Sequence, residues 1–144
     1  MISVKKLLEE KNQPRLIHLR PDNTVIDALQ LMEDKNIGAI MIMDGEQLIG
    51  IFSERDYARK GIIKGRKAKS THLTEVMIPD VITVSPDMDI NDCMKLFIDK
   101  RIRHLPVKDQ EKVIGMLSIG DIVNAIIQEQ TEHIKFLEQY IAGT

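Results

Sequence analysis

The sequence repeats itself once with a period of 65 residues, and this repeat limits the folds open to the chain. Residues 8–56 align with residues 73–121 without a gap, and 17 of the 49 aligned pairs are identical. Many other pairs match one aliphatic residue with another, as Leu16 with Val81. A repeat of this length indicates two copies of one structural unit. Half of 144 residues is too short to bury a stable core alone, so we expect the two copies to fold together.

Each copy has the same predicted order of elements, β-α-β-β-α. Proline stops the first strand, a capping residue followed by an acid three positions later opens the first helix, and a serine opens the second helix. In the first copy these features are strand 17–19, Pro21, Thr24, the apolar run 37–43, strand 48–52 and Ser53. In the second copy they are strand 81–84, Pro86, Asp89, the apolar run 102–107, strand 113–117 and Ser118.

We therefore predict an α+β fold of two β-α-β-β-α repeats, packed sheet to sheet with pseudo-twofold symmetry. The predicted bounds are 8–66 for the first repeat and 73–131 for the second, with helical extensions at 1–7 and 132–144. Such pairing creates two equivalent clefts between the halves, where ligands tend to bind.

Two segments exceed what the repeat requires. Residues 61–74 join the copies and carry Lys64, Arg66, Lys67 and Lys69, which indicates a solvated linker in preference to a polyanion site. The last helix runs from Asp121 to Ile141 with an apolar stripe along it. We expect its far half to pack either on residues 1–11 or on a second subunit.

Composition excludes several classes of protein. The 22 acidic and 20 basic residues nearly cancel, which argues against a strongly basic nucleic-acid binder, and five aromatic residues are too few for base stacking. The longest apolar run has seven residues against the roughly 18–20 of a membrane span. Charged residues within the first ten argue against a signal peptide. We expect a cytoplasmic protein without nucleic-acid or membrane partners.

The single cysteine, Cys93, excludes an internal disulfide framework and a multi-cysteine zinc site. Its helical context predicts a small buried thiol. The histidines have no metal-ligand spacing, so we predict no metal site.

The motif Gly-h-h-Ser-x-x-Asp, where h is hydrophobic, closes both copies. It occurs as residues 50–56 and 115–121. Ser-x-x-Asp is a helix capping box, and capping alone explains the pattern. A helix N-terminus also offers free N–H groups to an anion, and an adjacent carboxylate can accept both hydrogen bonds of a ribose diol. The pair therefore suits a nucleotide, with ribose on the acid and phosphate near the serine.

The tandem repeat with this motif resembles a pair of cystathionine-beta-synthase (CBS) domains, known as a Bateman module. Residues 101–107 and 81–86 are also similar to motifs of the second repeat in that family. The resemblance covers nearly the whole chain. It implies a stand-alone regulatory module that binds an adenosine ligand such as AMP, ATP or NAD in its inter-repeat cleft, needs no other cofactor, and forms a homodimer.

The resemblance also implies the residues of two sites. In the main site Asp121 would hold ribose and Ser118 would lie beside the phosphate. The strand at Thr83 and Val84 would meet adenine through its backbone, and the remaining predicted residues are Arg103, His104 and Pro106. The sequence context of His104 favours a hydrogen-bonded structural role over that of a base.

The second site is predicted to be weaker. Ser53 and Asp56 match the motif, but His18 stands where the second repeat has Thr83, and Ala39 stands where it has His104. Arg55 either supplies positive charge to this site or is an exposed residue of the first helical turn.

Three classes of function follow. The leading one is a nucleotide-sensing module. The alternative is a ligand-free structural or interaction module that acts through dimerisation and its C-terminal helix. An enzyme is disfavoured, because the sequence has no glycine-rich phosphate loop, nucleophile–base pair or two-acid site.

Overall fold

The structure is a computed structural model that describes residues 2–11 and 16–143. The described residues form two compact units. Unit 1 holds those within ranges 1–13, 83–109 and 115–144, and unit 2 those within 14–82 and 110–114. The units differ from the sequence repeats. The described residues of 1–13, which lead into the first repeat, belong to unit 1, and residues 67–82, which lead into the second repeat, belong to unit 2. The repeat bounds drawn from the sequence stay a prediction.

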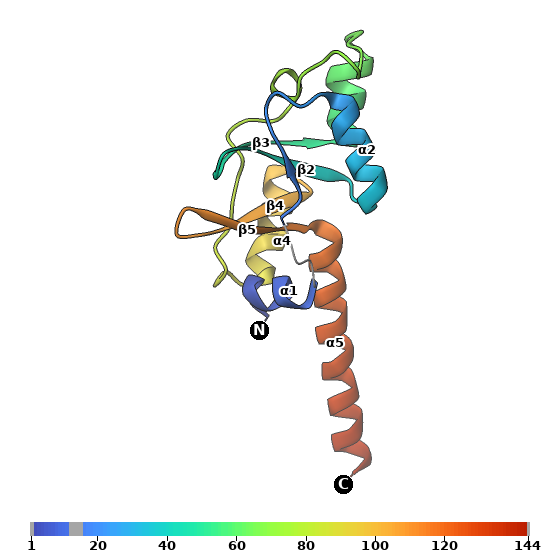
Figure 1. Ribbon diagram of the computed structural model, residues 1–144. Helices are drawn as coiled ribbons and strands as arrows, with labels where there is room; N and C mark the ends of the chain where they lie inside the picture. The colour runs from blue at the N-terminus through green and yellow to red at the C-terminus, as the bar shows by residue number, and fades with distance from the viewer. Residues whose placement is uncertain (1, 12–15, 144) are drawn as a thin grey trace. The chain divides into compact units, whose positions relative to one another are not determined.

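Unit 2 is built on a three-stranded sheet in the order β1-β2-β3 (Figure 1). Strand β2 lies in the middle, parallel to β1 and antiparallel to β3. All but the last residue of β2 are buried. The elements are β1 (His18–Leu19), α2 (Val25–Lys35), β2 (Ala39–Asp44), β3 (Gln47–Ser53), α3 (Glu54–Asp56), the π-helical segment η1 (Tyr57–Ile62) and the 3-10 segment η2 (Leu73–Glu75).

The predicted linker is part of the core of unit 2. Leu73, near the end of the segment, is fully buried in a cluster with residues of α2, β2 and β3. The main chain of this segment also bonds to the start of α2, where the Val25 N–H donates to Thr71 O over 2.9 Å. The expectation of a solvated linker is therefore wrong for these residues. It holds for the lysines at 64, 67 and 69, which are exposed.

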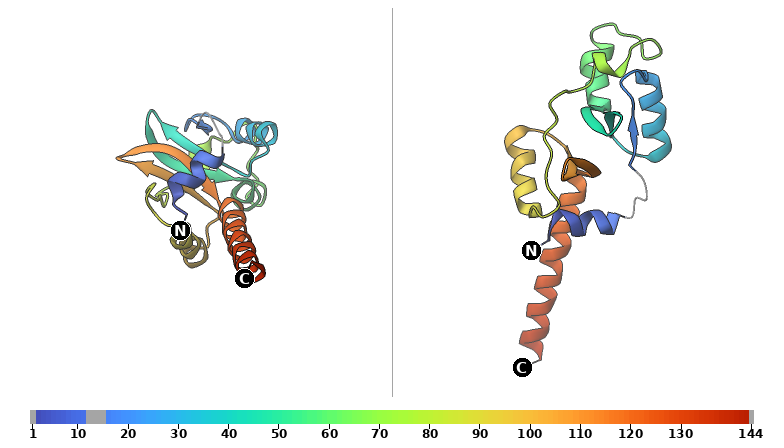
Figure 2. Two further views of the ribbon diagram at one scale, coloured as in Figure 1. Left: turned by 90° about the horizontal axis from the view of Figure 1, so that it is seen from below. Right: turned by 60° about the vertical axis from the view of Figure 1, so that its left-hand side comes forward.

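Unit 1 contains a two-stranded sheet, β4-β5, together with three helices (Figure 2). Val84 adds a parallel bridge to Val107 of β4. Helix α1 is tied to the segment before α4, because the Val4 and Lys5 N–H groups donate to Met88 O and Pro86 O, each over 2.8 Å. The elements are α1 (Val4–Lys11), α4 (Ile90–Lys100), β4 (His104–Asp109), β5 (Lys112–Ser118) and α5 (Ile119–Ala142).

Helix α5 continues well past the other elements of its unit (Figures 1 and 2). Ile122 and Ala125 are its buried residues, and every residue from 130 to 143 is exposed. The predicted packing of the far half on residues 1–11 is therefore wrong for the residues that the structure describes. Packing on a second subunit stays a prediction.

The α+β class with two sheets is confirmed. The N-terminal helix predicted over 1–7 begins at Val4 and ends at Lys11. Cys93 is fully buried, and burial together with the nearby carboxylates of Asp92 and Asp89 raises its pKa to about 11. Within ranges 2–11 and 16–143, every helix is too short or too polar to cross a bilayer.

Candidate functional site

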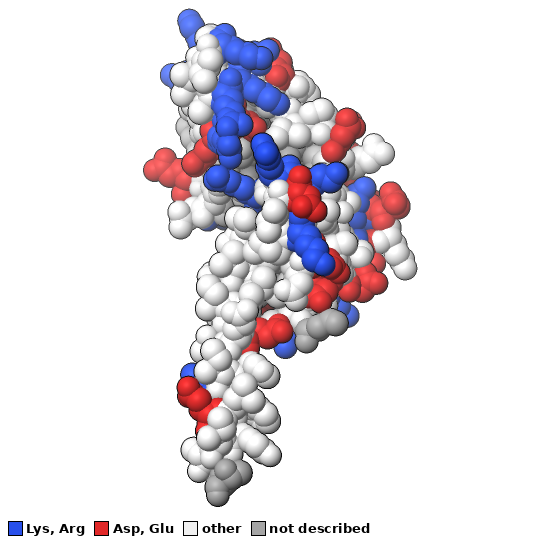
Figure 3. Space-filling model, turned by 180° about the vertical axis from the view of Figure 1, so that it is seen from behind, with Lys and Arg blue, Asp and Glu red and all other residues white. Residues whose placement is uncertain are grey.

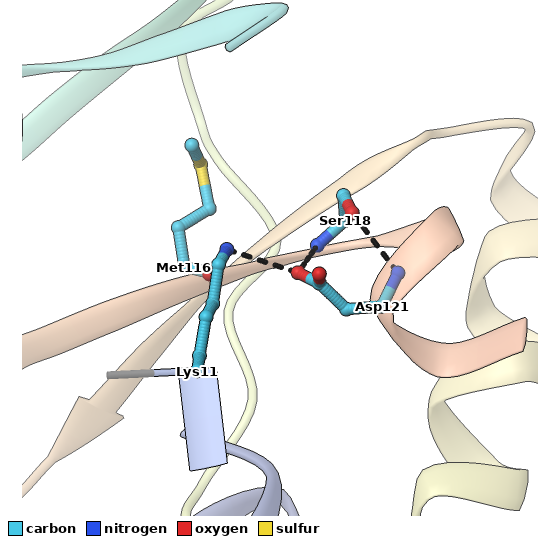
Figure 4. A network of polar contacts seen from close by, with 4 residues as sticks. All are labelled: Lys11, Met116, Ser118 and Asp121. Carbon is cyan, nitrogen blue, oxygen red and sulfur yellow. Dashed lines mark hydrogen bonds and ion pairs between the residues drawn. The ribbon is translucent and has the colours of Figure 1, made fainter. Parts of the chain in front are cut away.

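The serine and acid of the second motif meet at the start of α5, where β5 ends (Figure 4). Ser118 caps the helix, and its hydroxyl oxygen accepts from the Asp121 N–H over 3.1 Å. In return Asp121 Oδ2 accepts from the Ser118 N–H over 2.9 Å. This is the capping box expected from the sequence, and it holds the carboxylate at the positive end of a 24-residue helix.

Lys11 is the residue of this site that the sequence did not reveal. Its ammonium group lies 2.9 Å from Asp121 Oδ2 and donates to Met116 O over 2.8 Å (Figure 4). Lys11 is the last residue of α1, more than a hundred positions away in sequence. The repeat gave no signal for it, because the residue aligned with Lys11 is Val76.

The environment of Asp121 keeps its carboxyl group ionised. Burial alone would raise its pKa, but the Ser118 hydrogen bonds and the Lys11 ammonium together outweigh burial and lower the pKa below the usual 3.8. The side chain remains 26% exposed. Asp121 is therefore a charged acceptor that a ligand can reach.

A glycine in each motif allows the segment that leads into a repeat to approach the closing strand. A Cβ atom on Gly115 would lie 2.8 Å from a Leu8 methyl carbon of α1. A Cβ atom on Gly50 would collide with Met77 Sδ and lie 2.9 Å from its Cγ. The glycines of the Gly-h-h-Ser-x-x-Asp motif thus position α1 and residue 77 by close contact.

The prediction of a strand over 81–84 is wrong, because only Val84 forms a bridge, and that bridge joins it to β4. The Val84 N–H donates to Pro106 O over 3.0 Å, and Val84 O accepts from the Lys108 N–H over 2.9 Å. Both main-chain groups of Val84 are therefore used within unit 1. Since successive residues of a strand point their main-chain groups to opposite sides, those of Thr83 are directed away from β4. Adenine recognition of the predicted kind would then depend on Thr83.

The remaining residues of the main set lie at the beginning of β4. Arg103 is exposed, His104 is half-buried and Pro106 is buried. Arg103 O accepts from the Ile119 N–H over 2.9 Å, which places this end of β4 beside the start of α5. The structure thus brings the Arg103–His104 end of β4 next to the Ser118–Asp121 capping box.

The second predicted set lies in unit 2. Ala39 at the start of β2 pairs with Ser53 at the end of β3, and His18 pairs with Met41. Ser53 and Asp56 form a second capping box, in which Asp56 Oδ2 accepts from the Ser53 N–H over 3.0 Å and from its hydroxyl over 2.9 Å. Residue Asp56 is only 8% exposed. The second acid is therefore less accessible than Asp121.

The two basic side chains of this set, His18 and Arg55, are both exposed. His18 lies on the two-residue strand β1. Arg55 is the second residue of α3, the position at which the sequence left a surface role open.

A hollow of about 590 Å³ in unit 2 is not the predicted site. It is lined by Leu29, Met32, Glu33, Asn36, Ile37, Gly38 and Glu54. None of the predicted second-site residues is among them, and two glutamates would repel phosphate. Across the described parts of the chain, no three His, Cys, Asp or Glu residues are grouped so as to hold a metal ion.

Comparison with known proteins decides the family. The sequence model of the CBS domain matches residues 4–62 and again 73–128. The chain belongs to the CBS domain family. The predicted resemblance to a tandem CBS pair is therefore confirmed.

Relatives of this CBS-domain chain include a plant protein that is named for the same domain. It is 44% identical over 127 residues to the CBS domain-containing protein CBSX3, mitochondrial, of Arabidopsis thaliana. That alignment covers 85% of the chain and 62% of the plant protein, so the chain spans less than two thirds of this relative.

Two solved structures share the fold. A protein with CBS domains from Burkholderia ambifaria MC40-6 is 39% identical with a TM-score of 0.84, covering 90% of this chain and 96% of the other. The structure of CBSX2 in complex with AMP is 26% identical with a TM-score of 0.73, covering 90% and 99%.

Proposed function

We propose that this chain is a non-enzymatic regulatory module that binds an adenine nucleotide through the Ser118–Asp121 capping box. The observation that carries the proposal is the ionised, partly exposed Asp121 at the positive end of α5. The AMP bound to CBSX2, a protein of the same fold, supports a ligand of this class.

In the proposed complex Asp121 accepts hydrogen bonds from the ribose hydroxyls, and Ser118 lies beside the phosphate at the positive end of α5. Thr83 contributes main-chain groups to adenine, while Arg103 and His104 line the same region of unit 1 and Pro106 supports it from the core. AMP, ATP and NAD all carry this adenosine group, so they are the candidate ligands.

The second set, His18, Ala39, Ser53, Arg55 and Asp56, is proposed to bind more weakly. Asp56 is nearly buried, and both donors of Ser53 already bond to its Oδ2. A ligand at this site must displace the serine hydroxyl before it reaches that oxygen.

Calorimetric titration of AMP, ATP and NAD tests the proposal. Hydrogen bonds to a charged group contribute about 1.5–3 kcal/mol each, so Asp121→Asn is expected to weaken binding by at least about tenfold. Asp56→Asn is the comparison variant, since it removes the same charge from the equivalent position of the other repeat and is expected to change only the weaker site. Absence of binding at millimolar ligand, or unchanged affinity in Asp121→Asn, would refute the proposal.

We also propose that the protein is a homodimer. The exposed far half of α5 supports this, and it equally supports the alternative of an interaction module that works without a nucleotide. Truncation after Gln128 separates the two, because residues 130–143 are all exposed and their removal leaves the buried residues in place. Loss of self-association with nucleotide affinity intact shows that the helix and the site act separately.

The cytoplasmic location stays a prediction. The name of the Arabidopsis relative places that protein in mitochondria. Fractionation of cells that express the full-length protein would decide the location of this one.

A further inference from the structure

We propose that α5, from Val123 to Ile141, pairs with α5 of a second copy as a parallel, in-register, two-stranded coiled coil. The inference rests on the homodimer proposed above and names the surface and geometry that form it. Its basis is a set of exposed side chains that recur with alternating spacings of three and four residues along α5. They are Val123, Ile127, Gln130, Ile134, Leu137 and Ile141.

The spacing is that of a coiled-coil heptad, in which positions a and d face the partner helix. Assigning Ile127, Ile134 and Ile141 to a places Val123, Gln130 and Leu137 at d. Isoleucine at a with leucine at d, as at Ile134 and Leu137, favours two parallel strands. The seam is exposed within the single chain, since Ile127 and Ile134 are each 54% exposed and Leu137 is 44% exposed.

The area of the seam meets what a specific dimer requires. A half-exposed large apolar side chain offers roughly 100 Å² of accessible surface. Tyr140 flanks the seam and is 67% exposed. Together with the five apolar seam residues it offers roughly 600 Å² per helix. Two copies then bury more than the roughly 1,000 Å² expected of a biological interface. In Figure 3 the far part of α5 shows few charged side chains on its surface, consistent with burial against another helix.

A hydrogen-bonding pair at the positions that flank the seam also favours the parallel arrangement. With this assignment His133 occupies g and Glu138 occupies e of the following heptad. In a parallel pair these two positions face each other across the seam, so each Glu138 carboxylate accepts from the His133 imidazole of the other copy. Gln130 lies inside the seam at d, where a polar side chain fixes the register because it must meet a polar partner.

The test is self-association of the full-length protein by sedimentation. Leu137→Glu places a charge in the seam and is expected to raise the dimer dissociation constant at least about 100-fold. Gln139→Glu is the matched control on the outer face of the helix and leaves the dimer intact. Since both residues are exposed in the single chain, neither variant unfolds it, and circular dichroism verifies this.

A second variant tests the direction of pairing. Leu137→Cys forms a disulfide-linked dimer in a parallel in-register coil, because each Leu137 faces its counterpart, and Gln139→Cys does not. The native Cys93 does not compete, since it is fully buried.

The outcomes separate the two proposals. A Leu137→Glu variant that remains dimeric, or a Leu137→Cys variant that fails to cross-link, overturns the coiled coil while leaving the homodimer in place. A wild-type protein that is monomeric overturns both. Nucleotide affinity is expected to be unchanged in all of these variants, so a failure of nucleotide binding concerns only the Ser118–Asp121 site.

Discussion

Replacing Lys11 with methionine is expected to tighten the binding of adenosine. In the structure Asp121 Oδ2 accepts from both the Ser118 N–H and the Lys11 ammonium, each over 2.9 Å. A carboxylate oxygen has two acceptor positions, so this atom is fully used. A ribose diol that bonds to both carboxylate oxygens must therefore displace Lys11. Lys11→Met keeps the length of the side chain and removes the competing donor.

The magnitude follows from the exposure of the ion pair. The Lys11 and Asp121 side chains are 24% and 26% exposed, and a pair this close to solvent contributes at most about 1 kcal/mol. Removing the competitor is then expected to tighten adenosine binding by about fivefold. The free energy of unfolding should fall by no more than about the same 1 kcal/mol.

Calorimetry with adenosine measures the effect, because a ligand without phosphate reports on Asp121 alone. Lys11→Arg is the control, since it retains the positive charge and should bind adenosine as the wild type does. The difference between wild type and Lys11→Met should shrink as salt screens the ion pair. Weaker adenosine binding in Lys11→Met would refute the reasoning and make Lys11 part of the ligand site.

Four further outcomes are expected. Gly50→Ala should destabilise the chain by about 1–3 kcal/mol in urea unfolding, because the new methyl group meets Met77 as far back as its Cγ and Cβ atoms. Gly115→Ala should cost less, because a terminal methyl group of Leu8 can rotate away. Arg101 ends α4 in the left-handed region at φ 53°, as Asn36 ends α2, and asparagine adopts this conformation at a lower cost than arginine. Arg101→Asn should therefore raise the free energy of unfolding by about 0.5–1 kcal/mol, measured by thermal unfolding. A decrease would contradict this reasoning. Because the pKa of Asp121 is lowered in the folded state, its contribution to stability is present above the usual pKa of 3.8 and is lost as pH falls below it. Asp121→Asn should therefore flatten the acid limb of a plot of unfolding free energy against pH. An identical limb in both proteins would exclude this contribution. Cys93, with its pKa raised to about 11, should react with a thiol reagent only after unfolding, and fast labelling of the native protein would show that the α4 core opens.

The order of elements could be predicted from the sequence because local signals and the repeat agreed. Thr24, Ser53 and Ser118 each cap the helix that they were expected to open, and the apolar runs became β2 and β4. Both first helices also end at aligned positions, Asn36 and Arg101, with the same left-handed backbone. Features fixed by neighbouring residues were therefore well predicted.

The linker was misjudged because composition describes side chains one at a time. Its lysines are exposed as expected, but Thr71 and Leu73, which follow them, are buried. Long-range main-chain bonds to α2 hold this segment in the core of unit 2. A charge run shows that some side chains are solvated, and it does not show where the backbone between them packs.

The difference between the two acids also depends on contacts that the repeat does not contain. Asp56 and Asp121 occupy identical places in the motif and form the same capping box. Lys11 lies against Asp121, whereas the residue aligned with Lys11 in the other repeat is Val76, which is buried in the core. Asp121 is thus an ionised, partly exposed group with a cation against it, whereas Asp56 is nearly buried and accepts from both donors of Ser53. Duplication supplied two equal capping boxes, and the unequal residue at the aligned position makes Asp121 the acid at which the proposed ligand would compete with Lys11.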